Sequence, residues 1–274
     1  MRHDLRDVCM QIRRDTVRSI YRAGSGHPGS SLSAVEIMAT LYFTDIFTCF
    51  PDRPHAPERD RFVLSKGHAA PAFYSTLAHK GYFPLEWLDT LRTVGSPLQG
   101  YPNLQKLPCL ACAVGSLGQG LSIANGMALG LKRKGQTQQV FCLIGDGEQQ
   151  EGQVWEAAAF AGQHHLDNVC LIVDCNGLQL VDSMAIIKDM EPMDAKWDSF
   201  GWHVLHVDGH DTDALYDAYG SAKARTDKPT VILAKTVKGK GVSYMENQAE
   251  WHGAAPDEAQ YEQAMKELTT EVKA

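Results

Sequence analysis

Two polar turns that follow short apolar runs carry residues able to bind a metal ion. The apolar runs 140–144 and 169–173 are followed by Asp146 and Asn176, and the Leu178 carbonyl comes just beyond the second turn. Carboxylate, amide and carbonyl oxygens suit Mg²⁺, which takes about six oxygen ligands and usually receives some of them from phosphates and water. These protein oxygens leave room for a diphosphate. The spacing therefore predicts a magnesium site that is shared with a diphosphate group.

The glycines beside Asp146 support this prediction but also allow a simpler one. Gly147 has no side chain, so its N–H can approach a phosphate closely. Gly-Asp-Gly and Asn-Gly are also common turn sequences, and each alone fits an ordinary turn. Ligands of open α/β sheets bind beyond the carboxyl ends of the strands, however, and both sequences follow predicted strands with a single helix between them. This placement favours one shared binding site.

The sequence alternates between short apolar runs and helical stretches from residue 60 onward. Buried strands are predicted at 62–64, 140–144, 169–173, 204–207 and 231–233. Helices are predicted at 70–80, 118–134, 151–164 and 212–225, followed by a polar helix at 257–271. Strands buried on both faces and separated by helices are typical of a parallel sheet. We therefore expect a single doubly wound α/β domain over residues 1–274, with a mostly parallel sheet and helices on both faces.

Two helices are predicted before the first strand. Apolar residues over 5–21 have the spacing of one face of an amphipathic helix, which should stop in the Gly- and Pro-rich segment 23–29. Ser33 and Glu36 then match a capping box, in which each side chain satisfies a free N–H at the start of a helix. A second helix should therefore begin there and run through about Phe47.

The composition excludes several classes of protein. The 274 residues are 44% hydrophobic and carry a net charge of −7, the wrong sign for a general nucleic-acid-binding surface. No apolar run approaches the roughly 18 residues needed to span a bilayer, so no membrane association is expected. Charges near the start leave no apolar segment for a signal peptide. Seven cysteines in a chain of this length favour reduced thiols and a cytoplasmic location.

Several motifs in one order give the chain a resemblance to a known family. Gly145-Asp146-Gly147 followed by Asn176 has the form of the thiamine diphosphate motif. Nearly end to end, the chain resembles the N-terminal, diphosphate-binding part of transketolase. The other motifs that carry this resemblance are Ser25-Gly26-His27-Pro28-Gly29, Leu64-Ser65-Lys66-Gly67-His68, Gly115-Ser116-Leu117-Gly118-Gln119-Gly120, Glu151-Gly152, Lys235 through Gly241, and His252. The resemblance implies the thiamine diphosphate-binding fold.

The resemblance implies which residues hold the cofactor. Asp146, Asn176 and the Leu178 carbonyl would hold Mg²⁺. Gly147 and His68 would contact the diphosphate of thiamine diphosphate. These expectations agree with the magnesium–diphosphate site that the turn sequences predict.

The resemblance also implies roles nearer the reacting atoms. Gly115 and Leu117 would line the thiazolium side of the cofactor, and Glu151 is similar to a buried interface glutamate that communicates between cofactor sites. The histidines that surround the substrate and the reaction centre would be His27, His68 and His252. Imidazoles titrate near neutral pH, so they can carry protons to and from sugar hydroxyls.

The family transfers a two-carbon ketol unit from a ketose to an aldose, and thiamine diphosphate supplies the electron sink for this reaction. In the family, the glutamate that activates the cofactor and the arginines that bind the substrate phosphate lie in a second, pyrimidine-binding domain. No further α/β pattern follows residue 252 here. The resemblance therefore implies one half of a split transketolase, active only with a separate C-terminal subunit, with self-association in a heterotetramer. Its substrates would be sugar phosphates, or sulfonated or otherwise substituted sugars.

One position departs from the family pattern. Where transketolases usually carry Gly-His-Pro, this chain has Gly100-Tyr101-Pro102. Tyr101 would face the substrate in place of the histidine. A tyrosine can donate and accept a hydrogen bond, but with a pKa of about 10 it does not carry the positive charge of an imidazolium. A different donor ketose and drift at a tolerant position both account for the change.

Two other functions share these motifs. One is the alpha subunit of a thiamine-dependent 2-oxo acid dehydrogenase or decarboxylase, which the early histidines oppose because decarboxylation needs fewer groups for sugar hydroxyls. The other is a non-catalytic binding module of the same fold. Asp146, Asn176 and the intact histidines oppose this second alternative.

Three weaker signals remain. Cys109 and Cys112 have the spacing of a metal or redox pair, but no second pair accompanies them. The basic stretch Lys235–Gly241 lacks the P-loop pattern and is either a mobile loop over the cofactor or a solvated run of charge. His210 is provisionally counted among the ordinary histidines, although its Gly-His-Asp turn could lie near the site.

Overall fold

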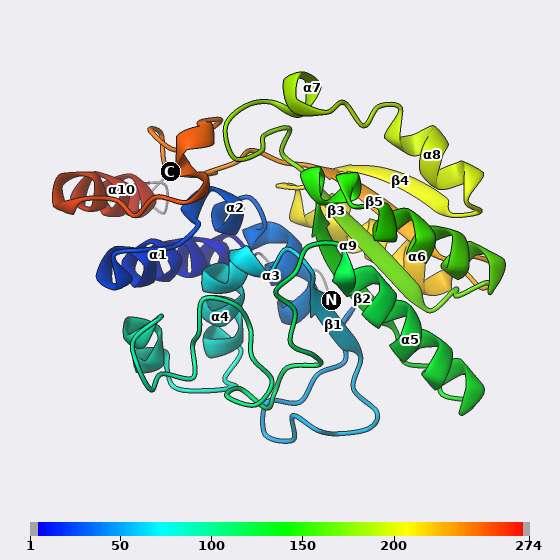
Figure 1. Ribbon diagram of the computed structural model, residues 1–274. Helices are drawn as coiled ribbons and strands as arrows, with labels where there is room; N and C mark the ends of the chain where they lie inside the picture. The colour runs from blue at the N-terminus through cyan, green and yellow to red at the C-terminus, as the bar shows by residue number, and fades with distance from the viewer. Residues whose placement is uncertain (1–4, 271–274) are drawn as a thin grey trace.

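Five parallel strands form one sheet in the computed structural model, which describes residues 5–270 (Figure 1). The strands are β1 (Arg61–Leu64), β2 (Val140–Gly145), β3 (Val169–Cys175), β4 (His203–Asp208) and β5 (Thr230–Lys235). Their order across the sheet is β1-β2-β3-β5-β4, and each neighbouring pair is parallel. All the predicted strands are confirmed, and their carboxyl ends share one edge of the sheet.

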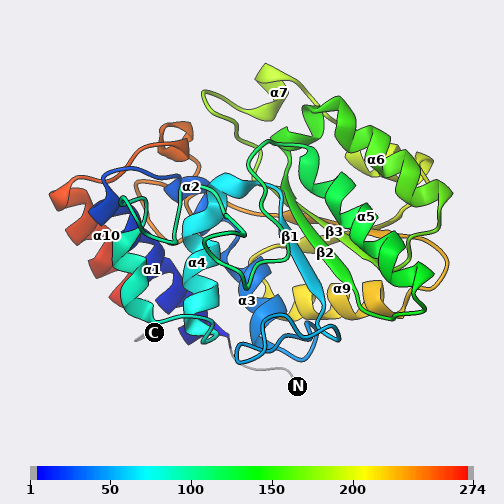
Figure 2. The same cartoon turned by 60° about the horizontal axis from the view of Figure 1, so that its bottom comes forward.

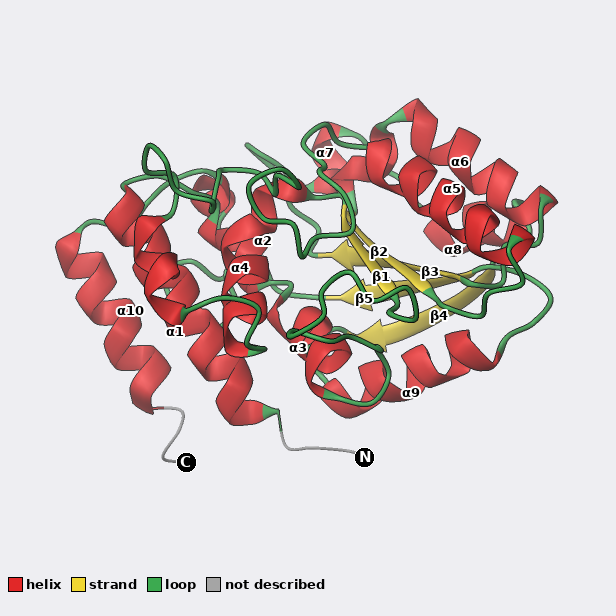
Figure 3. Cartoon of the chain, turned by 90° about the horizontal axis from the view of Figure 1, so that it is seen from below, coloured by secondary structure: helices red, strands yellow, loops and turns green. Residues whose placement is uncertain are grey.

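Helices cover both faces of the sheet. They are α1 (Arg6–Ala23), α2 (Pro28–Leu32), α3 (Val35–Phe43), α4 (Ala70–His79), α5 (Gln119–Arg133), α6 (Gly152–Gln163), α7 (Met184–Ile187), α8 (Met193–Ser199), α9 (Thr212–Ala224) and α10 (Glu258–Thr270). Helices α3, α4 and α9 pack on one face, and α5, α6 and α8 pack on the other (Figure 3). The doubly wound α/β fold is confirmed, and α4, α5, α6 and α9 match their predicted bounds to within one residue.

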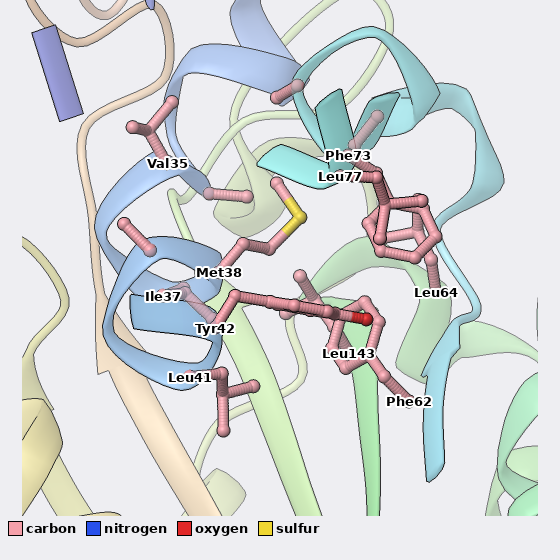
Figure 4. Packing of buried hydrophobic residues seen from close by; sticks show 14 of the residues in the cluster. Val35, Ile37, Met38, Leu41, Tyr42, Phe62, Leu64, Phe73, Leu77 and Leu143 are labelled. Carbon is pink, nitrogen blue, oxygen red and sulfur yellow. The ribbon is translucent and has the colours of Figure 1, made fainter. Parts of the chain in front are cut away.

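The core explains why the strands read as continuous apolar runs. Phe62 and Leu143 project from the sheet against Tyr42 of α3 and Phe73 of α4 (Figure 4). The Phe62 ring lies 5.8 Å from the Tyr42 ring and 5.1 Å from the Phe73 ring, measured between centroids. The opposite sides of β2 and β3 pack under α5 and α6. With both faces covered, alternation between apolar and polar residues would leave polar groups buried.

The capping box predicted at the start of α3 is wrong. The Ser33 hydroxyl donates to the Asp174 carboxylate (2.6 Å), and Glu36 pairs with Arg13. Both side chains are used in tertiary contacts, so α3 begins without a side-chain cap. The helix also ends before Phe47, the predicted limit.

The glycine-rich break after α1 is confirmed in part. Gly24 ends α1 in the left-handed conformation, with φ of 61° and its N–H bonded to the Tyr21 carbonyl. Pro28 and Gly29 do not stay in the loop, because they begin the short helix α2. Helices α7 and α8 were not predicted, since both are short and lie in a segment without helical periodicity.

Helix α10 packs along α1 at the side of the sheet, and α1 lies between α10 and α4 (Figure 2). The Tyr21 and Tyr261 rings stack there with centroids 4.2 Å apart. This confirms the polar C-terminal helix through Thr270, while its predicted last residue, 271, lies outside the described residues. Residues 1–4 and 271–274 of the expected single domain lie outside them as well.

Three further features concern the whole described chain. Within residues 5–270, no helix has both the length and the apolar character needed to cross a membrane. The seven cysteines form no disulfide with one another. Among the same residues, no group of three or more His, Cys, Asp or Glu side chains could hold a metal ion, so Cys109 and Cys112 do not belong to such a group.

Close packing of α6 on the turn before β4 gives a test of the fold. A Cβ at Gly162 would lie 1.8 Å from the Phe200 carbonyl oxygen, whereas a Cβ at Gly126, within α5, would meet nothing within 4 Å. We expect Gly162→Ala to lower the free energy of unfolding by about 2–3 kcal/mol, because overpacking forces backbone shifts. Gly126→Ala, the matched control, should raise it by about 0.5–1 kcal/mol. Denaturant unfolding of both variants measures the difference, and equal effects would contradict this packing.

Candidate active site

A cleft of about 460 Å³ lies at the carboxyl ends of the strands. It brings together every site residue that the sequence predicted. These residues are His27, His68, Tyr101, Gly115, Leu117, Asp146, Gly147, Glu151, Asn176, Leu178 and His252. They come from segments far apart in the sequence that meet only through the sheet topology.

The expected pairing of Asp146 and Asn176 follows from the strand register. β2 and β3 are parallel neighbours, and Gly145 is paired with Asp174 at their ends. Asp146 therefore lies one residue beyond this pair on the β2 side, and Asn176 lies two residues beyond it on the β3 side. The Gly177 N–H donates to Asp146 Oδ2 (2.6 Å), which ties the two turns together.

Asp146 is a buried carboxylate whose hydrogen bonds come from backbone N–H groups. Its side chain accepts from the Gly147 N–H (2.8 Å) and from the Gly177 N–H. Burial and then the negative charge of Asp174 raise the pKa of Asp146 to about 6, and these two backbone bonds offset the shift only in part. A divalent cation would compensate the charge. This carboxylate therefore fits a metal ligand better than a turn residue.

The other predicted ligands complete an oxygen-only set. Asn176 Oδ1 accepts from the Leu178 N–H (3.2 Å), which orders the second turn. The Leu178 carbonyl lies within 3.4 Å of Lys238 Nζ and keeps a second lone pair. One carboxylate, one amide and one carbonyl cannot enclose an ion, so a cation here would need oxygens from a bound ligand. This donor set fits Mg²⁺ with a diphosphate.

The three predicted histidines form a compact triangle. The ring centroids of His27 and His68 are 5.3 Å apart, those of His27 and His252 are 5.5 Å apart, and those of His68 and His252 are 5.2 Å apart. His27 follows α1, His68 follows β1, and His252 closes the segment after β5. The buried Nδ1 of His27 has no hydrogen-bond partner among the residues that the structure describes.

The protein alone keeps these imidazoles neutral. Burial, followed by the charges of Arg92 and Lys238, lowers the pKa of His27 to about 4. Burial and then Lys238 lower the pKa of His252 to about 3. Burial, with the ammonium of Lys66 next, lowers the pKa of His68 well below its ordinary value. An anion bound beside the lysines would offset their share of these shifts, but the larger contribution of burial would remain.

Sequence reasoning missed two buried lysines in the cleft, although both lie inside motifs that it singled out. Lys66 is 1% exposed and pairs with the fully buried Asp174. Lys238 is also 1% exposed, and its Nζ lies 3.0 Å from His252 Nδ1. Burial and then Lys66 lower the pKa of Lys238 to about 8. The alternative of a solvated run of charge is therefore wrong for Lys238, because this side chain points into the cleft.

A buried glutamate shapes the loop that carries Gly115 and Leu117. Glu148 accepts from the Gly118 N–H (2.8 Å) and the Gly145 N–H (3.2 Å), and from the Ser65 hydroxyl. The carboxylate thus joins the ends of β1 and β2 to the start of α5. Like the lysines, it was not recognised from the sequence.

The outer wall of the cleft is exposed and largely apolar. Leu117 is 39% exposed and Tyr101 45%, while Leu180 and Val181, in the turn after β3, reach 67% and 79%. Glu151 is exposed as well, so within this chain alone it is not the buried glutamate that the resemblance implies. Burial of Glu151 would require another chain.

Comparison with known proteins relates nearly the whole chain to one family. Residues 5–273 match the family model described as transketolase, thiamine diphosphate binding domain. The chain is 43% identical to the 6-deoxy-6-sulfo-D-fructose transketolase subunit of Clostridium sp. (strain MSTE9), over 98% of this chain and 97% of that protein. It is 40% identical to an apulose-4-phosphate transketolase subunit of Phocaeicola vulgatus, over 95% of this chain and 92% of that protein.

Longer relatives match the chain over only part of their own length. Human transketolase is 41% identical over 98% of this chain but 42% of the human protein. The crystal structure of transketolase from Campylobacter jejuni superposes with a TM-score of 0.91 at 33% identity, covering 97% of this chain and 42% of that one. The chain thus spans nearly all of the two subunit relatives and less than half of these transketolases.

The metal assignment gives a direct prediction. Asp146→Asn should leave the fold intact but weaken thiamine diphosphate binding in saturating Mg²⁺ by at least about 100-fold, since loss of even an outer-shell partner costs about 10–100-fold. Calorimetric titration measures the affinity, and circular dichroism checks the fold. The matched control is Asp52→Asn, at an exposed turn. Retained Mg²⁺-dependent affinity in Asp146→Asn would remove the metal assignment.

Proposed function

Because the chain belongs to the family of the transketolase thiamine diphosphate binding domain, we propose that it is the N-terminal subunit of a split transketolase. In this function it transfers a two-carbon ketol unit from a ketose to an aldose. The observation that carries the proposal is the single cleft that combines the Asp146 metal-ligand set with the triangle of histidines. The relatives named for 6-deoxy-6-sulfo-D-fructose and apulose-4-phosphate support a substituted sugar, either phosphorylated or sulfonated, as substrate.

The residues of this chain hold the cofactor and its metal in the proposed function. Bound thiamine diphosphate supplies the electron sink for carbon–carbon bond cleavage and formation. Asp146, Asn176 and the Leu178 carbonyl hold Mg²⁺. Gly147, which has no side chain to obstruct a phosphate, would lie beside the diphosphate together with His68 and the Lys238 ammonium, where charge-assisted hydrogen bonds are strong. Gly115 and Leu117 line the thiazolium side.

The remaining cleft residues face the substrate. His27 and His252 are neutral imidazoles that donate to and accept from sugar hydroxyls. Tyr101 stands at the mouth of the cleft with its ring against Gly67, where an imidazole is usual in the family.

A second chain completes the site in this proposal. The exposed apolar wall with Leu117, Leu180 and Val181 suits a protein surface better than water. The matched partner is a C-terminal transketolase subunit that carries the pyrimidine-binding and C-terminal domains and the activating glutamate. Two copies of each chain would form a heterotetramer, with Glu151 buried where cofactor sites meet. The name "subunit" of the two shorter relatives supports this arrangement.

The other functions considered from the sequence are less well supported. The relatives are named transketolases, which does not favour the alpha subunit of a 2-oxo acid dehydrogenase or decarboxylase. A non-catalytic module would have no use for a buried carboxylate with an elevated pKa beside three neutral histidines. We also propose that the protein acts in the cytoplasm, since seven cysteines without a disulfide suit a reducing compartment.

Because the proposed site is divided between two chains, we predict that this chain is active only when its partner is present. With xylulose and ribose phosphates, or with their sulfonated and branched analogues, the purified chain should show no turnover above background. Addition of a C-terminal transketolase subunit should restore turnover, and the complex with Asp146→Asn should stay inactive. A coupled spectrophotometric assay measures each rate. Robust activity of the chain alone would refute the split-subunit proposal.

Tyr101 gives a prediction on donor choice. Tyr101→Phe removes only the hydroxyl, so kcat/KM for the preferred donor should fall about tenfold, as expected for one lost hydrogen bond. Tyr101→His should change the ratio of kcat/KM values between substituted and ordinary ketose phosphates. Steady-state assays of the reconstituted complex measure both effects. Unchanged ratios in both variants would instead indicate drift at a tolerant position.

A further inference from the structure

The loop that carries Lys238 is anchored on both sides of this residue. The Val237 N–H donates to His210 Nε2 (2.8 Å), and the Lys240 carbonyl accepts from Arg13 Nε (3.1 Å). A backbone bond to α2 also holds the loop between these points. The anchors fix the backbone from which the Lys238 side chain enters the cleft. These hydrogen bonds tie the loop to the turn after β4, to α1 and to α2.

Both anchors lead to one buried carboxylate. Glu36, which is 7% exposed, accepts from Arg13 Nη2 (2.7 Å) and from His210 Nδ1 (2.9 Å). Burial raises the pKa of Glu36, but the charge of Arg13 and the bond from His210 outweigh it and hold the pKa at about 2. Glu36 is therefore ionised at neutral pH.

This carboxylate determines the tautomer of His210. An ionised carboxylate can only accept, so Nδ1 of His210 must carry the hydrogen. The Val237 N–H can only donate, so Nε2 must present its lone pair. These two requirements are met together by the neutral tautomer with hydrogen on Nδ1 and by no other state of the ring.

We propose that His210 is a positioning residue, which, through the Glu36–His210–Val237 hydrogen bonds, sets where Lys238 Nζ stands against His252 in the cleft. His210 touches neither the cleft nor the proposed metal ligands. Its effect on the site passes through the loop backbone, and Lys238 Nζ is placed 3.0 Å from His252 Nδ1 as a result. The inference rests on the proposed function only in taking this cleft as the cofactor site. From the sequence, His210 is provisionally counted among the ordinary histidines, because no neighbouring residue indicates that its partners are Glu36 and Val237.

The tautomer is tested first, on the chain without cofactor. In a chain labelled with ¹⁵N-histidine, His210 at neutral pH should show a protonated Nδ1 and an unprotonated Nε2. Assignment comes from the loss of these signals in His210→Asn. An Nε2-protonated tautomer or an imidazolium would overturn the proposal, whatever the protein does with thiamine diphosphate.

The anchor is tested next by amide hydrogen exchange. His210→Asn keeps a short amide that can donate to Glu36 but removes the acceptor that Nε2 offers to Val237. Exchange of the Val237 amide should rise by about tenfold, the effect of one net hydrogen bond. The matched control, His203→Asn, changes the same residue type at the opposite end of β4 and should leave Val237 unchanged. Equal exchange in the two variants would overturn the anchor.

A double-mutant cycle tests whether His210 acts through Lys238. In the complex with the C-terminal subunit, His210→Asn should weaken thiamine diphosphate binding about fivefold, within the range for residues of one network. In a Lys238→Met background the same change should alter affinity by less than about twofold. Additive effects would overturn a role through Lys238. His203→Asn should be additive with Lys238→Met.

The outcomes separate this inference from the proposed function. If Lys238→Met leaves cofactor affinity unchanged while the tautomer and exchange results hold, the cleft assignment fails and the anchor stands. If affinity depends on Lys238 but not on His210, the proposed function stands and the positioning role is refuted. If His210→Asn lowers Tm strongly, the exchange and affinity measurements are repeated with His210→Phe, which keeps an aromatic ring and removes both bonds.

Discussion

The buried carboxylate of Asp174 is the interaction on which the site depends. It is fully buried and accepts from the Ser33 hydroxyl (2.6 Å), from the Thr236 hydroxyl and from the Lys66 ammonium. Its partners lie at the ends of β1 and β5 and between α2 and α3. A buried charge is costly unless it is paired and fully hydrogen-bonded, so these segments must meet at one point for the chain to fold. The same segments carry the histidines and Lys238, and folding therefore also builds the cleft.

The Asp174 pair also determines the charge that the cleft presents. Because Lys66 is used to neutralise Asp174, Asp146 is left as a carboxylate whose pKa burial and its acidic neighbour raise. Lys238 faces it with a pKa lowered to about 8, and the histidines beside Lys238 are neutral. The cleft thus holds a carboxylate, Asp146, whose negative charge is only partly balanced, and beside it a buried ammonium, Lys238. A divalent metal bound to a diphosphate complements both, which is why the electrostatics agree with the oxygen donor set.

The sequence predicted what depends on local pattern and on the topology of parallel sheets. Buried strands need apolar residues on both faces, and strands that run in parallel place Asp146 and Asn176 at one edge whatever the loops do. The prediction from sequence was wrong where a side chain can make either a local or a distant contact. Ser33 and Glu36 fit a capping box locally but make tertiary contacts instead. His210 was undervalued for the same reason, since its partners come from distant segments.

The open wall of the cleft explains how such a site can be divided between two chains. The proposed metal ligands and the histidines are fixed by this chain's own core, so they need no partner to take their places. Leu180 and Val181 are exposed beside them, and in the proposed complex the partner covers these side chains and the cofactor together. The cofactor and the partner would then contact each other as well as this chain. Whatever factor the partner contributes to cofactor affinity, the cofactor contributes to partner affinity, because such a coupling free energy is reciprocal. In the proposed enzyme, assembly and cofactor loading are therefore coupled equilibria, and a half-site without its partner keeps its geometry while remaining inactive.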